Sequence, residues 1–323
     1  ISNLKDKISA KEPKEPKELK NQTMSLSCFS HVKRVLNENG NILRPSVPAL
    51  IVVQELIVDR SYSMKWLGAA PAQGTLHFIN EQKMIAQKTG AKIYFSLTSF
   101  DDTATTYIDN VRIETVNPTS AEMTAMILPR GNTLLVDTVY ARLCAMRTKI
   151  ETIVKSLPRE IRELKPKMTV VVAVITDGQD NKSKLCTDAQ LNTLITKKRA
   201  EGFAILFLAA NQDAIQTAKK WGITPDCAQT FGATPMKTQA CFKSASAASA
   251  RAVSGQAPSF TKRERQSTAP VRPQQLRLGG GGGGVCLPRR RHPFVSQNVT
   301  PRALGYAPQR ITMCRQNTVA AYN

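Results

Sequence analysis

Two apolar segments limit what this chain of 323 residues can fold into. Residues 50–58 and 170–176 are rich in β-branched side chains, which favour buried strands. Each segment leads directly into an aspartate, Asp59 in the first case and Asp177 in the second. Strands that alternate with helices predict a mostly parallel sheet, and in such a sheet ligands bind beyond the carboxyl ends of the strands. Both aspartates are therefore expected at the ligand-binding edge of one sheet.

The pattern of apolar residues predicts an order of elements for the whole central part of the chain. The expected strands cover 50–58, 92–100, about 104–115, 168–176, 203–210 and about 227–231, and the expected helices cover about 72–89, 133–155, 187–201, 212–220 and 235–253. The turn at Asp101 and Asp102 joins the second strand to the third and predicts one antiparallel edge strand. The predicted fold class is α/β, a doubly wound and mostly parallel sheet with one antiparallel edge strand.

Side chains that carry oxygen follow three of the expected transitions between elements. Asp59, Ser61 and Ser63 alternate after the first strand, Thr133 stands at the start of a helix, and Asp177 follows a later strand. Hard divalent cations such as Mg²⁺ prefer oxygen ligands of this kind. Each residue alone is more typical of a helix cap or a turn. In this order on this fold pattern, the five residues predict one metal site.

Other polar and aromatic residues near this site have different expected roles. Asp137 is expected in the first turn of a helix close to the site, but not as a direct ligand. Asp180 and Asp188 are expected to be solvated or to cap helices. Tyr62 and Trp66 have two open interpretations, since each either faces a partner or packs over the loop that carries the serines.

With these residues the chain resembles the von Willebrand factor A family, over about residues 48–254. The metal-ion-dependent adhesion site of that family has the pattern Asp-x-Ser-x-Ser, then Thr, then Asp, and every position has a counterpart here. The stretch 207–214 is similar to intracellular members from bacteria, phages and large DNA viruses. Tyr62 departs from the family, which often has Gly there. The resemblance implies a bound Mg²⁺, with Mn²⁺ as the alternative, that grips an acidic residue of a protein partner.

Composition divides the chain into a domain and two flanks. Residues 1–47 form the expected N-terminal arm and loosely helical lead-in, with a Lys-Glu-Pro repeat at 11–18, and residues 48–254 form the domain. Residues 255–323 form the expected tail, which contains a glycine run at 279–284, eleven Lys or Arg residues and one acidic residue. The net charge of +21 is therefore concentrated in the tail, which is expected to contact an acidic partner or nucleic acid.

These observations predict a metal-dependent protein–protein interaction module that is not an enzyme. The chain has no GxGxxG, GxxxxGK[ST] or GxSxG motif, and no histidine is placed to act as a base. The alternative is a structural assembly protein, such as a minor capsid component of a large DNA virus, that acts through its extended arms. No apolar run approaches the roughly 18 residues of a membrane span. Without a signal peptide in the given sequence and with seven scattered cysteines, the expected location is intracellular, in the cytoplasm or in a virion.

Overall fold

The computed structural model describes residues 50–270, except 164, 167 and 211–213, together with the backbone of two short strands before them. The chain divides into two compact units, residues 1–47 and 48–323. In the first unit, β1 (Val35–Leu36) and β2 (Ile42–Leu43) form an antiparallel pair. The prediction of a loosely helical lead-in is wrong at β1 and β2, because these residues form strands. Asn39-Gly40 lies between them in the sequence, and Asn-Gly between apolar residues is a strong signal for a hairpin.

A six-stranded sheet forms the centre of the second unit. Its strands are β3 (Ile51–Asp59), β4 (Lys92–Phe100), β5 (Ala104–Arg112), β6 (Met168–Thr176), β7 (Ala204–Ala210) and β8 (Ala228–Phe231). The strand order is β5-β4-β3-β6-β7-β8, and every neighbouring pair is parallel except the pair of β4 with β5. The predicted α/β class, with one antiparallel edge strand, is confirmed.

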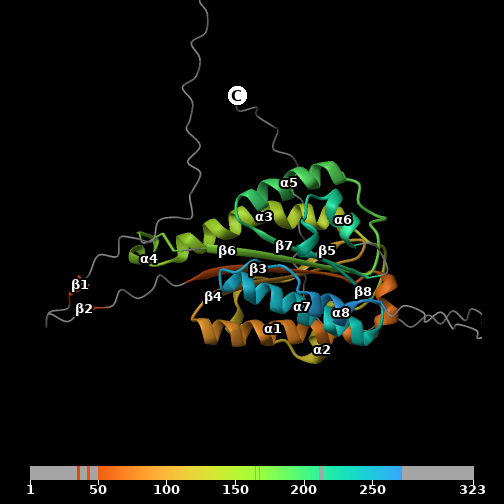
Figure 1. Cartoon of the computed structure of the whole chain (residues 1–323), viewed down its shortest axis with the longest axis horizontal. Helices are drawn as coiled ribbons and strands as arrows, with labels where there is room; N and C mark the ends of the chain where they lie inside the picture. Colours follow the sequence, from red (N-terminus) through yellow and green to blue (C-terminus); the bar gives the residue numbers. More distant parts are fainter. Residues whose placement is uncertain are drawn as a thin grey trace, which may run out of the picture. The chain divides into compact units, whose positions relative to one another are not determined.

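Helices cover both faces of this sheet. Their bounds are η1 (Tyr62–Leu67), α1 (Ala70–Thr89), η2 (Ile113–Thr115), α2 (Ser120–Met126), α3 (Leu135–Ser156), α4 (Arg159–Glu163), α5 (Asp188–Ala200), α6 (Ala214–Lys220), η3 (Pro225–Cys227), α7 (Pro235–Val253) and α8 (Lys262–Thr268). Helices α3, α5 and α6 lie on one face, and α1, α7 and α8 lie on the other (Figure 1). Because both faces are covered, the central strand β3 is buried along its whole length.

The sequence predicted the longer helices but missed a short one, α2. This helix begins with a capping box, in which the Thr119 side chain accepts a hydrogen bond from the backbone of Glu122 and the Glu122 side chain accepts one from the backbone of Thr119. The spacing Thr-x-x-Glu is a readable signal for a helix start. Its helix was overlooked because only Met123 is fully buried in it, so the apolar period is weak.

The folded domain continues beyond its predicted end at residue 254. Phe260 is buried against the core, and the guanidinium of Arg251 forms an ion pair of 2.8 Å with Glu264 on α8. The side-chain amide of Gln229, on β8, donates a hydrogen bond of 2.6 Å to the hydroxyl of Thr268. Residues 255–270 therefore belong to the domain and not to the tail. Residues 271–323, which carry most of the predicted tail, lie outside the described residues.

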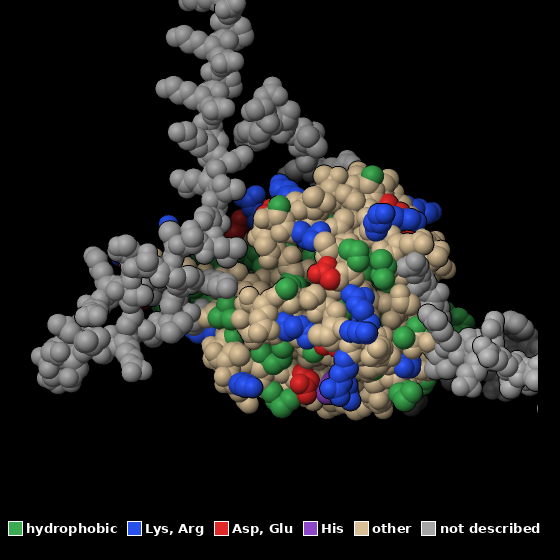
Figure 2. Space-filling view, in the orientation of Figure 1, with side chains coloured by type: hydrophobic (Ala, Val, Ile, Leu, Met, Phe, Trp, Pro, Cys, Tyr) green, Lys and Arg blue, Asp and Glu red, His purple; other side chains and the backbone are tan. Residues whose placement is uncertain are grey.

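The surface of the described domain is mixed in character. On the face that Figure 2 shows, Lys and Arg side chains lie in small separate groups between hydrophobic and uncharged ones. Within the described part of the chain, none of the helices combines the length and the apolar character that crossing a membrane requires.

Candidate metal centre

The predicted site lies where the two central strands end side by side. Strands β3 and β6 are parallel neighbours, with Val58 opposite Ile175, so Asp59 and Thr176 end their strands together. The hydroxyl of Thr176 donates a hydrogen bond of 2.5 Å to Oδ2 of Asp59. The loop after β3 and the loop after β6 therefore start from one fixed point at the carboxyl edge of the sheet.

A continuous set of hydrogen bonds links four of the five predicted ligands. The backbone N–H of Ser61 donates to Oδ1 of Asp59 at 2.6 Å. The hydroxyl oxygens of Ser61 and Ser63 lie 3.0 Å apart, and the Ser63 hydroxyl donates to Oδ1 of Asp177 at 2.7 Å. Oxygens from the loops after β3 and β6 thus occupy one small region.

Thr133, the fifth predicted ligand, faces the same region from the loop before α3. A Cβ atom placed on Gly178 would lie 3.4 Å from the Thr133 hydroxyl oxygen and 3.7 Å from that of Ser63. The backbone N–H of Thr133 donates to Oδ1 of Asn181 at 2.8 Å, and the N–H of Asn181 donates back to the Thr133 carbonyl at 3.1 Å. All five residues are therefore brought together.

The electrostatics of this region fit a cation. Asp59 is fully buried, and burial raises the pKa of its carboxyl to about 7, although hydrogen bonds from Thr176 and Ser61 oppose the rise. Burial also raises the pKa of Asp177. Two carboxylates that have lost much of their water are costly as anions, and a divalent cation would offset that cost. Ser63 is exposed, so the site opens to the surface.

The chemical type of the candidate ligands also fits a hard metal ion. In the described ranges no group of three or more His, Cys, Asp and Glu side chains is arranged to hold a metal. The site instead combines two carboxylates with three hydroxyls, which suits oxygen-preferring ions and not the nitrogen and sulfur ligands typical of zinc sites. Asp59, Ser61, Ser63, Thr133 and Asp177 are the residues that would hold the ion.

Sequence reasoning missed Arg60, which anchors the loop between Asp59 and Ser61. Arg60 is 1% exposed, and its guanidinium donates to the hydroxyl of Tyr107, to Thr105 Oγ1 at 3.2 Å and to the carbonyl of Met126 at 3.3 Å. It also forms an ion pair of 3.0 Å with Asp101. The available signal was a charged residue directly after an apolar strand and its terminal aspartate, but its partners lie in distant segments.

Asp180 ties the start of α3 to the loop after β6. Its Oδ1 accepts the backbone N–H groups of Leu135 at 2.8 Å and Val136 at 3.2 Å, so it caps α3 from another segment. The expectation of a capping role for Asp180 is confirmed. Asp188, for which the same expectation was made, is exposed, which agrees with the solvated alternative, and it also accepts a hydrogen bond of 2.8 Å from the indole N–H of Trp221.

Asp137, in the first turn of α3, makes the reciprocal connection. Its carboxylate accepts the backbone N–H groups of Lys184, Leu185 and Cys186, at 2.9, 3.1 and 2.8 Å for the closest oxygen of each. Asp137 therefore holds the loop after β6 in place, as an acid close to the site that lies outside the set of five. The loop and the start of α3 are fixed to one another in both directions.

The two aromatic residues of η1 point outward. The side chains of Tyr62 and Trp66 are 56% and 80% exposed. Packing over the loop, one of the two open interpretations, is therefore wrong for both. That they face a partner, the other interpretation, stays a prediction. The ammonium group of Lys65 lies over the Tyr62 ring, 5.3 Å from its centre.

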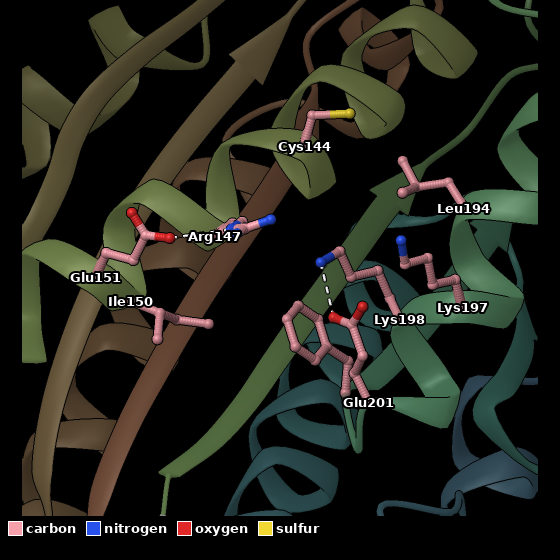
Figure 3. Close-up of a pocket in the computed structure, with 9 residues that line it drawn as sticks. Cys144, Arg147, Ile150, Glu151, Leu194, Lys197, Lys198 and Glu201 are labelled. Carbon is pink, nitrogen blue, oxygen red and sulfur yellow. Dashed lines mark hydrogen bonds and ion pairs between the residues drawn. The ribbon is translucent and has the colours of Figure 1, made fainter. Parts of the chain in front are cut away.

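A separate hollow of about 480 Å³ lies between α3 and α5 (Figure 3). Two ion pairs line it, Arg147 with Glu151 and Lys198 with Glu201. Burial raises the pKa of the Cys144 thiol at its rim, which disfavours the reactive thiolate. Cys144, Cys186, Cys227 and Cys241 are free thiols within the described residues. None of the five predicted metal ligands lines this hollow.

Comparisons with known proteins find likenesses among solved structures. No family model matches the chain, and no curated protein does. Similar solved structures include proximal thread matrix protein 1 from the mussel byssus with a zinc-occupied MIDAS motif, at 19% identity over 64% of this chain and 46% of that chain, with a TM-score of 0.38. A second is a von Willebrand factor type A protein from Catenulispora acidiphila, at 15% identity over 62% of this chain and 43% of that chain, with a TM-score of 0.40. A third is manganese-loaded TRAP from Plasmodium vivax, at 16% identity over 49% of this chain and 56% of that chain, with a TM-score of 0.33.

These likenesses concern the fold, and this chain spans 43% to 56% of the length of those three proteins. The sheet order, the single antiparallel edge strand and the helices on both faces are the features that the resemblance implies. The described domain thus has the doubly wound α/β architecture that the resemblance to the von Willebrand factor A family implies.

Proposed function

We propose that this domain is a divalent-cation-dependent protein interaction module. The observation that carries the proposal is the convergence of oxygens from Asp59, Ser61, Ser63, Thr133 and Asp177 at the carboxyl edge of the sheet. Three loops contribute these oxygens, and each loop is held by contacts to the others. A site that is preassembled in this way does not need to order its loops when it binds an ion.

Mg²⁺ is the proposed ion, with Mn²⁺ as the alternative, because both accept hard oxygen ligands. When bound, the ion would offer a coordination position to a carboxylate from outside. Ser63 is exposed and Asp177 is half-buried, so the chain leaves this side of the site accessible. The two carboxylates of the site would balance the double positive charge of the ion. The exposed Lys65 and Lys184 on the same loops add further positive charge, so the surface around the site favours an acidic group on the partner. The proposed partner is therefore a protein that presents Asp or Glu.

The proposed module is not an enzyme. Among the described residues the histidine is His77, which lies on α1 beside Glu81, at 4.0 Å. The serine hydroxyls contact each other and the Asp177 carboxylate, and no histidine is among the five residues of the site. This arrangement supports binding of a carboxylate and provides no partner for proton transfer through an imidazole.

Calorimetry on the full chain tests cation binding. Mg²⁺ and Mn²⁺ should each bind with saturation at one site, and Asp59→Asn should abolish that binding. Asp102→Asn is the matched control. Asp102 is an exposed carboxylate at the same end of the sheet, and it accepts a hydrogen bond from the side-chain amide of Asn132. Cation at about 100 times its Kd should also stabilise the wild type by about 2.7 kcal/mol. Unchanged binding by Asp59→Asn, or equal loss in both variants, would contradict the ligand assignment.

The alternative function, assembly through extended arms, concerns residues outside the described ones and stays a prediction. The same holds for the contact of the tail with an acidic partner or nucleic acid, and for the location in the cytoplasm or a virion. Because the domain extends to Pro270, the informative deletion removes 271–323. If the tail makes an electrostatic attachment, that deletion should abolish salt-sensitive association while cation binding by the domain is retained.

A further inference from the structure

Exposed large apolar side chains gather around the proposed metal site. Within the described residues, eight large hydrophobic side chains are well exposed, and four of them lie on the loops that build the site or border it. Tyr62 and Trp66 are on η1, directly after Ser61, and Leu185 is on the loop that follows Asp177 and is 67% exposed. Leu128, 49% exposed, lies on the loop between α2 and α3 that also carries Thr133. Apolar exposure of this kind marks interaction surfaces.

Hydrogen bonds hold these three loops together, so the four apolar side chains belong to loops that meet at one site. The backbone N–H of Tyr62 donates to the Gly131 carbonyl at 3.1 Å, which joins η1 to the loop before α3. The Ser63 hydroxyl joins η1 to Asp177 at 2.7 Å. Leu185 is held to the first turn of α3 through its own backbone N–H, which donates to Asp137. We call Tyr62, Trp66, Leu128 and Leu185 the apolar rim.

Basic residues accompany the apolar rim. Lys65 is exposed next to Tyr62, and Lys184 is exposed next to Leu185. Arg130, beside Gly131, is 60% exposed although its Nε contacts Asp101 at 2.5 Å. Lys182 is 42% exposed and pairs with Asp102 at 3.3 Å. The loops after β3 and β6 therefore each place an exposed lysine beside an apolar side chain, and this charge favours an acidic partner segment. Asp101 and Asp102 partly offset the charges of Arg130 and Lys182.

From this surface we infer the chemistry of the partner segment: an Asp or Glu side chain with large apolar residues within one or two positions of it. The inference rests on the proposed function, because the acidic residue is assigned to the cation. The apolar neighbours are assigned to Trp66 and Tyr62 on η1 and to Leu185 on the loop after β6. Trp66, the most exposed of the four, is the strongest candidate for an energetic anchor, since Trp and Tyr dominate binding hot spots.

A selection with a random peptide library tests the partner chemistry. The full chain is immobilised in Mg²⁺, phage that display random short peptides are bound, and phage are eluted with EDTA. The enriched peptides should combine an acidic residue with neighbouring large apolar residues. A labelled peptide made from the enriched pattern should bind Trp66→Ser/Leu185→Ser about tenfold or more weakly than the wild type by fluorescence anisotropy.

The matched control is Met84→Ser/Val111→Ser, which removes two exposed apolar side chains that lie outside the site, on α1 and β5. This control should bind the peptide as tightly as the wild type. Calorimetry should show unchanged cation binding in both double variants, since neither alters a predicted ligand.

Each other result has a distinct meaning. Acidic peptides without apolar neighbours, bound equally by the rim variant, would overturn the inference and leave the proposed function standing. Enriched peptides that remain bound in EDTA, together with no cation binding in calorimetry, would overturn the proposed function itself. Normal cation binding with no enriched peptide would also contradict the inference, because a surface of this composition should select short segments.

Discussion

Replacing Glu55 by glutamine should destabilise the protein strongly, because Glu55 neutralises two buried cations. Glu55 lies in the middle of β3 and is 1% exposed. Its carboxylate accepts hydrogen bonds from Arg142 at 2.7 Å, from Lys149 at 2.6 Å and from Thr98 at 2.8 Å. Arg142 and Lys149 project from α3 and are themselves buried, so this cluster joins the helix to the centre of the sheet.

The magnitude follows from what remains after the Glu55→Gln substitution. The new amide side chain would keep the size of the original and an oxygen that accepts from Thr98, but it would carry no negative charge. The negatively charged partner left to Arg142 and Lys149 would be Asp109, at 3.3 and 2.6 Å, and Asp109 is 53% exposed, so solvent weakens its compensation. Removing one partner of a buried ion pair costs about 3–5 kcal/mol. The free energy of unfolding should fall by this amount in urea denaturation followed by circular dichroism.

Glu151→Gln is the matched control for this experiment. Glu151 also pairs with an arginine, Arg147, at 3.0 Å, but both side chains are at least half exposed. An exposed pair four residues apart on a helix contributes about 0.3–0.5 kcal/mol. If the two Glu→Gln substitutions destabilise equally to within about 1 kcal/mol, the argument from burial is refuted.

The pH dependence of this effect has a definite sign. Burial pushes the pKa of Glu55 upward, but the charges and hydrogen bonds of Arg142 and Lys149 outweigh it, and the pKa lies below its ordinary value of 4.5. A group with a lowered pKa in the folded state stabilises the protein above its ordinary pKa and loses this contribution as pH falls through the folded-state pKa. The difference between the wild type and Glu55→Gln should therefore be constant at neutral pH and shrink in acid.

Three further predictions concern packing, the extent of the domain and a helix cap. In Gly74→Ala the new Cβ would meet the ring of Phe242 at 2.3 Å, so urea denaturation should show a loss of about 1–3 kcal/mol, reduced when Phe242→Leu is added. A chain that ends at 254 should melt at a lower temperature than one that ends at 270, because it loses buried Phe260 and the partner of Gln229; equal melting temperatures would contradict this. Asp180→Ala should cost about 0.5–2 kcal/mol as a lost cap and weaken Mg²⁺ binding in calorimetry, with Asp188→Ala as the comparison for the second effect.

The sequence predicts the sheet well because its strands have uniform environments. Strands β3 and β6 are covered on both faces, so each is a nearly unbroken apolar run that can be recognised without knowing its neighbours. The predicted bounds 92–100, 168–176 and 235–253 match β4, β6 and α7. The convergence of the five candidate ligands could likewise be predicted, because each lies near an element boundary that the local sequence pattern marks.

Features that depend on contacts between distant segments could not be predicted in this way. Arg60 acquires its role only when Tyr107 and Met126 come near it, and Asp180 caps a helix that begins 45 positions earlier in the chain. Helix α8 has few buried residues, and its attachment depends on Arg251 and Gln229. The basic and polar composition of residues 255–270 is therefore typical of a tail, although tertiary contacts hold this segment in the domain.

The pairing of β3 with β6 has a mechanical consequence for the proposed binding of a partner. Asp59 ends one of these strands and Asp177 follows the other, and each strand has a neighbour on both sides. A pull on an ion held between the two residues would act along the strand axes, at the middle of the sheet. The backbone hydrogen bonds that flank both strands would then be strained together in shear and would not open one after another. Tension on the partner would reach the strongest part of the domain first.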